Sequence, residues 1–187
     1  MTNPLPAGPF GVVLADPPWR FRTWNETNDA KSARRHYSLL EADAIASIPV
    51  RDALAPDCAL FMWATWPTIQ QAFPVMKAWG FRYSGLAWEW VKFNPTTGKY
   101  AFGTGYGTRK NLEPCLLGIR GAPKIGNRSV RDFLMAPRRE HSRKPDEQYE
   151  RIESMYGGPY LELFGRSTRL GWSTWGNEVG KFDGVFA

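Results

Sequence analysis

Histidine and cysteine are scarce in this chain of 187 residues, which contains two of each. The histidines, His36 and His141, and the cysteines, Cys58 and Cys115, show none of the close spacing that is typical of metal ligands. Two cysteines cannot form a disulfide framework, and both stand in apolar runs, as small core side chains do. The sequence therefore predicts no metal centre and no disulfide scaffold.

Long apolar runs are missing as well. The longest, residues 59–64, is far shorter than the roughly 20 residues that cross a bilayer. Residues 1–10 show no basic cluster followed by an apolar core, which would mark a secretory signal. We therefore expect a cytoplasmic chain without membrane association. The chain is 43% hydrophobic and 22% charged, with no repeat or long linker, and this composition predicts a single folded domain over residues 1–187.

Positive charge and aromatic side chains are both plentiful. The formal net charge is +6, and aromatic residues make up 14% of the chain. Residues 120–144 alone hold eight basic and two acidic residues. A basic stretch in an aromatic-rich domain suggests a polyanionic partner that is held through its phosphates. A solvated basic face without a partner is the alternative that charge alone leaves open.

Short apolar runs alternate with helical patterns along the chain. We expect strands at 10–15, 58–63, 81–91, 115–119, 160–164 and 171–175, and helices at 39–48, 67–79 and 145–156. This alternation predicts an α/β fold, with a mostly parallel sheet that carries helices on both faces. Mobile substrate loops are expected at about 20–36, 94–110 and 120–143. In such sheets, ligands bind beyond the carboxyl ends of the strands, which directs attention to the residues after the first strand.

Those residues are Asp16, Pro17, Pro18 and Trp19. Each proline stiffens the chain and removes a backbone donor, so the loop presents a carboxylate, bare carbonyls and an indole within four residues. A carboxylate and a carbonyl that accept both hydrogens of an exocyclic amine would free its lone pair for attack. The indole would hold the base by stacking, which contributes about 1–3 kcal/mol. A stiff strand terminator, with Trp19 capping the core, is the structural alternative.

The string Val12-Val-Leu-Ala-Asp16-Pro-Pro-Trp19 resembles motif IV of S-adenosylmethionine-dependent amino-methyltransferases, in the DPPW form of the adenine-N6 methyltransferases. Further strings resemble that family in the same order: His36-Tyr37, Leu60-Phe-Met-Trp63, Ala78-Trp-Gly-Phe81, Gly103 to Glu113, His141 to Glu147, Glu162 to Arg166, and Gly171 to Glu178. The resemblance covers nearly all of residues 10–180. It implies one Rossmann-like methyltransferase domain with the permuted, beta-class motif order.

The resemblance also implies a role for each matched position. Asp16 and the Pro17 carbonyl would accept the amine hydrogens, Pro18 would belong to the same catalytic loop, and Trp19 would stack on the adenine. Lys144 would pair with the cofactor carboxylate. The remaining cofactor positions would be Asp16, His141, Ser142, Phe164, Gly165, Arg166, Asn177 and Glu178. Tyr37 lies in the string that resembles the family's substrate loop. The clustering of positive charge, rather than the resemblance, makes Arg34, Arg35, Arg109, Lys110, Arg138 and Arg139 candidate phosphate contacts, and Tyr106 is a further expected substrate contact.

Two departures from the family pattern limit this transfer. Ser167-Thr-Arg169 stands where eukaryotic relatives often carry His-Asn, so that contact is not carried over. Little chain precedes Phe10, so a cofactor contact made by an upstream strand in larger relatives is expected to be missing.

The expected activity is methyl transfer from S-adenosylmethionine to adenine N6 in nucleic acid. DNA is the preferred target, because the compact chain resembles stand-alone bacterial or phage members and shows no appended RNA-binding module; RNA stays open. A silent nucleic-acid-binding partner subunit and a methyltransferase for cytosine N4 or a small molecule are the alternatives. A homodimer is a further open possibility.

Overall fold

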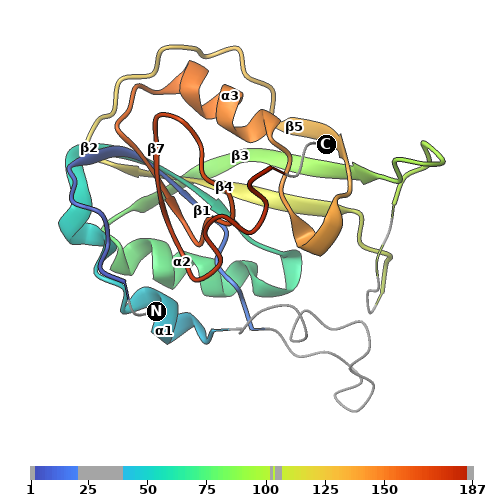
Figure 1. Ribbon diagram of the computed structural model, residues 1–187, viewed down its shortest axis with the longest axis horizontal. Helices are drawn as coiled ribbons and strands as arrows, with labels where there is room; N and C mark the ends of the chain where they lie inside the picture. The colour runs from blue at the N-terminus through green and yellow to red at the C-terminus, as the bar shows by residue number, and fades with distance from the viewer. Residues whose placement is uncertain (1–2, 21–39, 102, 104–106, 185–187) are drawn as a thin grey trace.

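A seven-stranded sheet forms the centre of the molecule, in a computed structural model that describes residues 3–20, 40–101, 103 and 107–184 (Figure 1). The strands are β1 (Phe10–Ala15), β2 (Leu54–Trp63), β3 (Arg82–Phe93), β4 (Leu112–Arg120), β5 (Phe133–Pro137), β6 (Tyr160–Leu163) and β7 (Trp172–Trp175). Their order is β5-β3-β4-β2-β1-β6-β7, and only the two pairings of β4 are antiparallel. The expected α/β fold with a mostly parallel sheet is confirmed.

Helices lie on both faces of this sheet (Figure 1). The α-helices are α1 (Ala42–Ala46), α2 (Ile69–Ala78) and α3 (Glu147–Met155), and short 3₁₀ turns occupy η3 (Val50–Ala53), η4 (Trp66–Thr68) and η5 (Glu140–Ser142). Successive residues of a strand point to opposite faces. Val13 therefore packs in the cluster that α1 and α2 cover, whereas Leu14 packs in the cluster that contains Ile152 of α3.

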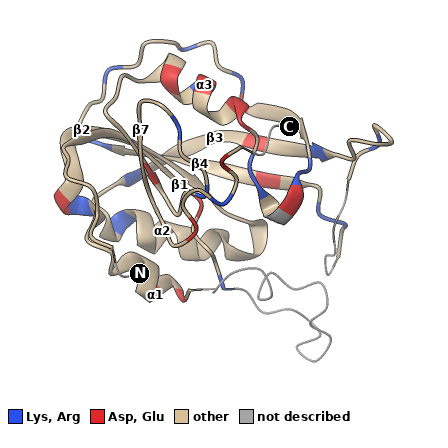
Figure 2. Ribbon diagram, viewed as in Figure 1, with Lys and Arg blue, Asp and Glu red and all other residues tan. Residues whose placement is uncertain are grey.

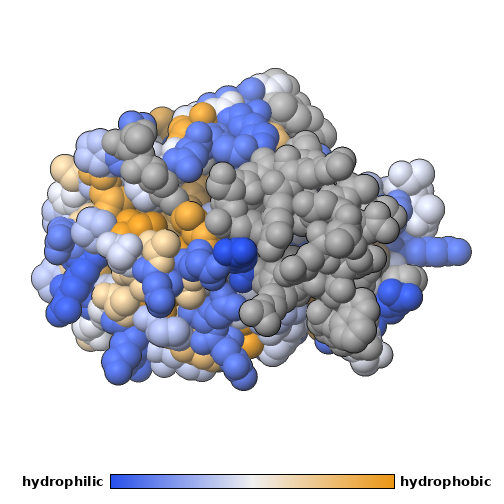
Figure 3. All heavy atoms as spheres, turned by 90° about the horizontal axis from the view of Figure 1, so that it is seen from below, coloured by the Kyte–Doolittle hydropathy of each residue, from blue (hydrophilic) through white to orange (hydrophobic). Residues whose placement is uncertain are grey.

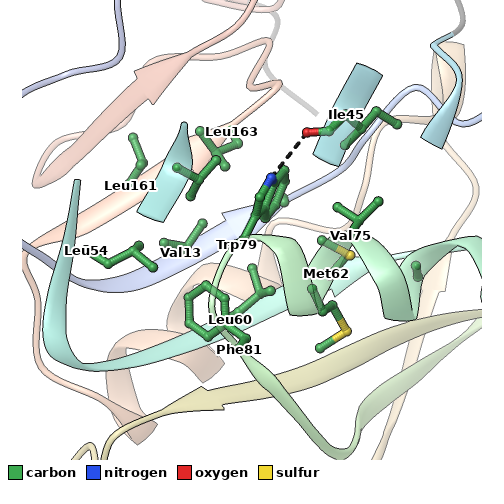
Figure 4. Close-up of a cluster of buried hydrophobic side chains, with 14 of the residues drawn as sticks. Val13, Ile45, Leu54, Leu60, Met62, Val75, Trp79, Phe81, Leu161 and Leu163 are labelled. Atoms are coloured by element: carbon green, nitrogen blue, oxygen red, sulfur yellow. Dashed lines mark hydrogen bonds between the residues drawn. The ribbon is translucent and has the colours of Figure 1, made fainter. Parts of the chain in front are cut away.

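The core beneath α1 and α2 is centred on Trp79 (Figure 4). Its indole N–H donates a hydrogen bond to the backbone oxygen of Ile45 at 3.2 Å, and its ring is 1% exposed. The ring lies among Val13 and Leu60 of the sheet and Val75 of α2. This cluster fixes α1 and α2 to the sheet, because burying each large apolar side chain contributes about 1.5–3 kcal/mol.

The structure differs from the sequence prediction in three elements. Residues 120–143 are not one loop, because β5 lies within them and pairs in parallel with residues 89–93 of β3. The helix expected over 39–48 is shorter, since α1 ends at Ala46, before Pro49. Strand β2 starts at Leu54, four residues before the expected start. The expected loop at 20–36 falls almost entirely outside the described residues.

None of the described helices is both long and apolar enough to cross a membrane. Viewed from the side of α1 and α2, the surface mixes polar side chains with scattered apolar ones (Figure 3). Within the same described ranges, no group of three or more His, Cys, Asp or Glu side chains is arranged to hold a metal ion.

Candidate active site

The loop after β1 places a carboxylate at the carboxyl edge of the sheet. The Asp16 side chain is 26% exposed and lines a cavity at this edge. Its backbone N–H donates to the oxygen of Leu163 on β6 at 3.4 Å. The Pro17 oxygen accepts the Trp19 N–H at 2.8 Å, and a carbonyl oxygen has a second lone pair for another donor. The expected carboxylate and carbonyl therefore stand together at one strand end.

Trp19 does not lie where the stacking role requires it. Its ring is 5% exposed and belongs to the core cluster beneath α1 and α2. Its indole N–H donates to the backbone oxygen of Trp63 at 2.9 Å. A ring buried in the core offers no open face to a base, so this arrangement corrects the expectation that Trp19 stacks on adenine. The indole instead anchors the loop against the end of β2.

Lys144 also has a different set of partners from the one expected. Its Nζ lies 2.9 Å from Asp16 Oδ2, 2.9 Å from Glu113 Oε1 and 3.3 Å from the Ser142 oxygen. An ammonium group has three donors, and these three acceptors use them all. Lys144 therefore holds the Asp16 carboxylate in this arrangement, and it does not present a donor to a cofactor carboxylate.

Glu113 is a site residue that the sequence reasoning missed. It lies on β4 with its side chain 7% exposed, between the ammonium groups of Lys92 and Lys144. Burial alone would raise the Glu113 pKa, but the two cations outweigh it and lower that pKa to about 2. Burial alone would lower the Lys144 pKa, but Asp16 and Glu113 outweigh it and raise it. Four groups, from Lys92 to Asp16, thus form one continuous chain of opposite charges.

The cavity beside Asp16 has a volume of about 650 Å³. One part of its wall is polar, with Asp16, Arg166, Asn177 and Glu178, and another part is apolar, with Pro4, Leu5, Leu40, Ile48, Pro49, Phe164 and Trp175. Small-molecule sites typically enclose about 300–1,000 Å³ and combine apolar walls with a few placed polar groups. This cavity has the size and lining that are typical of a small-molecule site.

The amino-terminal segment forms part of the wall of that cavity, although no strand precedes β1 in the described residues. Asn3, Pro4 and Leu5 line the wall. The Asn3 oxygen accepts the indole N–H of Trp175 at 2.9 Å, and Leu5 packs against the core cluster beneath α1 and α2. These contacts tie the segment to β7.

The end of β6 forms a tight corner at the cavity. Phe164 adopts a left-handed backbone with φ of 62°, which non-glycine residues rarely do and which often marks a functional site. A Cβ on the next residue, Gly165, would lie 2.3 Å from Thr174 Cγ2. Glycine is therefore required there because the Thr174 side chain on β7 approaches so closely.

A second, much smaller hollow of about 30 Å³ lies on the other side of Asp16, towards α3. Glu162 lines it and accepts hydrogen bonds from the Tyr149 hydroxyl at 3.1 Å. Burial raises the Glu162 pKa to about 7, and the nearby charge of Asp16 acts in the same direction.

The residues expected to contact nucleic acid differ in whether the structure describes them and in how exposed they are. Arg34, Arg35, Tyr37 and Tyr106 lie outside the described residues, as does the His141 side chain. Arg109, Lys110 and Arg138 are exposed. Arg139 is engaged with Asp146, at 2.6 Å, and its side chain is 13% exposed. Of the two expected arginines after β5, Arg138 is therefore the one whose side chain faces solvent.

Comparison with known proteins supports the family resemblance that the sequence motifs indicate. The MT-A70 family model matches residues 10–178. The type II methyltransferase M.MunI of a Mycoplasma species is 30% identical, over 94% of this chain and 80% of that protein. An Arabidopsis thaliana N(6)-adenosine-methyltransferase MT-A70-like protein is 32% identical, over 92% of this chain and 24% of its own length. The human N(6)-adenosine-methyltransferase catalytic subunit METTL3 is 33% identical, over 95% of this chain and 29% of its own length.

The chain thus spans most of the Mycoplasma relative and about a quarter of the plant and human ones. The matched residues contain the loop after β1, the charge chain and the cavity wall after β6. From this match and the site geometry together, the chain belongs to the MT-A70 family of N6-adenine methyltransferases.

Proposed function

We propose that this protein transfers a methyl group to N6 of adenine in nucleic acid, with DNA as the preferred target. One observation carries the proposal: Asp16 stands at the wall of a cofactor-sized cavity, held there by the buried ammonium of Lys144. An exocyclic amine has two hydrogens to donate. The Asp16 carboxylate and the second lone pair of the Pro17 carbonyl offer two acceptors from adjacent residues.

The cavity fits S-adenosylmethionine in size and in chemistry, and the fit supports this cofactor. When bound, the cofactor supplies an electrophilic methyl group on a sulfonium. The Glu178 carboxylate and the Asn177 amide are suitable partners for ribose hydroxyls, because a carboxylate accepts two hydrogen bonds. Arg166 takes the role of partner to the cofactor carboxylate, since a guanidinium binds carboxylates in a bidentate manner and Lys144 has no donor left.

The chain of alternating charges from Lys92 through Glu113 and Lys144 to Asp16, here called the charge chain, holds the Asp16 carboxylate in place before a substrate binds. A catalytic acceptor works best when it is already held where the substrate needs it, so that no reorganisation accompanies the reaction. Lys144 holds Asp16, Glu113 holds Lys144, and Lys92 balances Glu113. The target adenine must be unpaired or flipped out of a duplex to reach Asp16, because the reacting nitrogen is otherwise enclosed in the base stack.

Two considerations favour DNA over RNA and activity over a silent binding role. The chain covers 80% of the type II methyltransferase M.MunI, but only 24–29% of the adenosine methyltransferases from Arabidopsis and human. The acceptor Asp16 and its supporting lysine are both in place, and a silent subunit has no need of either.

The test is incubation with radiolabelled S-adenosylmethionine and separate pools of DNA and RNA, followed by nucleoside analysis. Labelled N6-methyladenine from DNA is the expected product. Asp16→Ala is expected to abolish transfer with an unchanged circular dichroism spectrum, and Asp52→Ala, which removes an exposed carboxylate on η3, is expected to retain it. If neither pool is labelled and calorimetry detects no cofactor binding, the proposal fails and a silent platform is the better description.

A further inference from the structure

The connection from β3 to β4 begins with a compact projecting hairpin, residues 93–101, which we call the arm (Figure 1). The Asn94 N–H donates to the Lys99 oxygen at 2.8 Å, and the Gly98 N–H donates to the Asn94 oxygen at 2.9 Å. The Asn94 side chain accepts backbone N–H groups of the turn, at 2.9 Å and 3.2 Å. Gly98, with φ of 65°, closes the turn. The tip is thus internally hydrogen-bonded.

The base of the arm is clamped by a single side chain. Asn111 Oδ1 accepts the Lys92 N–H at 3.0 Å, and Asn111 Nδ2 donates to the oxygens of Lys92 and Ala101. The Ala101 N–H in turn donates to the Lys92 oxygen at 2.9 Å. One asparagine therefore ties both ends of the arm to the start of β4, so the arm is a fixed projection of the sheet.

The arm exposes an aromatic ring among positive charges. Tyr100 is 65% exposed, which is more than any other aromatic side chain that the structure describes. Residues 91–112 contain four basic residues and no acidic one, and the exposed Lys99 directly precedes Tyr100. Figure 2 shows basic residues on the arm. Aromatic rings beside cations are the feature with which proteins hold single-stranded nucleic acid, through stacking on bases and contact with phosphates.

The arm also emerges at the edge of the sheet that carries the catalytic loop. β3 runs parallel to β5 and antiparallel to β4, and β4 runs antiparallel to β2, so β3 ends at the same edge as β1. Lys92, at the base of the arm, begins the charge chain that leads through Glu113 and Lys144 to Asp16. The arm and the carboxylate are thus connected through a few buried groups.

We propose that the arm holds the nucleic acid next to the target adenine, with Tyr100 stacked on an exposed base and Lys99 against a phosphate. This inference rests on the proposed function, and it assigns to Tyr100 the stacking contact on the strand. The sequence had assigned stacking to Trp19, whose ring is buried. A base beside a flipped or unpaired adenine exposes one face, which the ring of Tyr100 can cover.

The experiment measures dissociation constants by fluorescence anisotropy, with end-labelled oligonucleotides of double-stranded DNA, single-stranded DNA and RNA. Tyr100→Ala is expected to weaken binding by about 5- to 150-fold. Tyr100→Phe keeps the ring and is expected to bind within twofold of the wild type. The matched control is Tyr83→Ala, because Tyr83 is 48% exposed at the opposite end of β3, where it packs on Phe73.

The contribution of Lys99 is read from the salt dependence. Lys99→Ala is expected to reduce the slope of log affinity against log salt by about one. Equal affinity of Tyr100→Ala and the wild type for all three oligonucleotides would overturn the inference. Equal losses in Tyr83→Ala and Tyr100→Ala would overturn it too, because they would show that any exposed tyrosine contributes as much.

Failure of the arm and failure of the proposed function give different results. If the wild type methylates nucleic acid while Tyr100→Ala binds and reacts normally, the arm has no role and the proposed function stands. If the wild type labels neither DNA nor RNA, the proposed function is wrong, and anisotropy still decides separately whether Tyr100 contacts a strand.

Discussion

Lys144 Nζ donates to Asp16 Oδ2 across 2.9 Å, and these two residues are 128 positions apart in the sequence. Asp16 follows β1, whereas Lys144 follows the 3₁₀ turn η5 and precedes α3. The loop after β1 is therefore held by a segment that also begins a helix on the opposite face from α1 and α2. Removing Lys144 would leave the Asp16 and Glu113 carboxylates, two charges of one sign, facing each other near the centre of the molecule.

Lys144→Met is expected to destabilise the protein by about 3–5 kcal/mol and to abolish methyl transfer. The change leaves the Asp16 and Glu113 carboxylates without the cation between them. Urea unfolding gives the loss in stability, and nucleoside analysis gives the loss in activity. Lys124→Met, at an exposed lysine, is the control and should change neither. Equal stability of the two variants would contradict the bridging role of Lys144.

Leu5→Ala is expected to weaken S-adenosylmethionine binding by about tenfold, because it removes apolar surface from the cavity wall. Isothermal titration calorimetry measures this change directly, without turnover. The control is Leu170→Ala, at a leucine that is fully exposed. Wild-type affinity in Leu5→Ala would show that the amino-terminal segment does not touch the cofactor.

Glu162 is expected to make stability depend on pH between about 4.5 and 7. The folded protein keeps Glu162 protonated up to a pKa of about 7, while an unfolded chain releases this proton near 4.5. The folded state therefore binds the extra proton in that window, and the free energy of unfolding falls as pH rises through it. The full change is about 3 kcal/mol.

Glu162→Gln should remove this contribution, because glutamine does not titrate and still accepts the Tyr149 hydroxyl. Urea unfolding at pH 5 and pH 8 is the measurement. The difference in stability between the two pH values should be smaller in the variant than in the wild type. The same difference in both proteins would show that another group is responsible.

Gly165→Ala is expected to destabilise the protein by more than about 2 kcal/mol, because its Cβ would lie 2.3 Å from Thr174 Cγ2 and 3.1 Å from Glu162 Cδ. Gly157→Ala adds a Cβ that meets nothing within 4 Å, so it should leave stability nearly unchanged. Thermal unfolding compares the two. Similar melting temperatures would mean that β6 and β7 adjust to the extra carbon.

Arg138 and Arg139 are expected to differ in their contribution to nucleic-acid binding. Arg138 is exposed, so Arg138→Ala should lower the salt slope of binding by about one. Arg139 is engaged with Asp146, so Arg139→Ala should leave that slope unchanged. Oligonucleotide binding across a series of salt concentrations is the measurement. A reversed order would show that Arg139 exchanges Asp146 for a phosphate.

The position of Asp16 was predictable because a buried parallel strand must end at the edge where ligands bind. The direction in which Trp19 points was not, because four letters of sequence do not show whether an indole covers the core or a ligand. The Trp19 ring caps the core, as in the structural alternative of a stiff strand terminator.

Glu113 and β5 were missed for different reasons. Glu113 stands in the strand Leu112–Arg120 among apolar neighbours, and its cationic partners lie far away in the sequence, so no local pattern identifies it. β5 left a weak signal, since Leu134 and Ala136 alternate with exposed residues. An alternation over only five residues is too short to predict a strand inside a basic stretch whose composition favours a loop.

The arm interrupts the chain between two neighbouring antiparallel strands, and Asn111 closes it at the root. An insertion or deletion beyond that closure leaves the β3–β4 ladder in register, together with the lysine and the glutamate at its end. The hairpin can therefore change in length and in its tip residues without displacing Lys92 and Glu113, so the surface offered to a strand can vary independently of the charge chain.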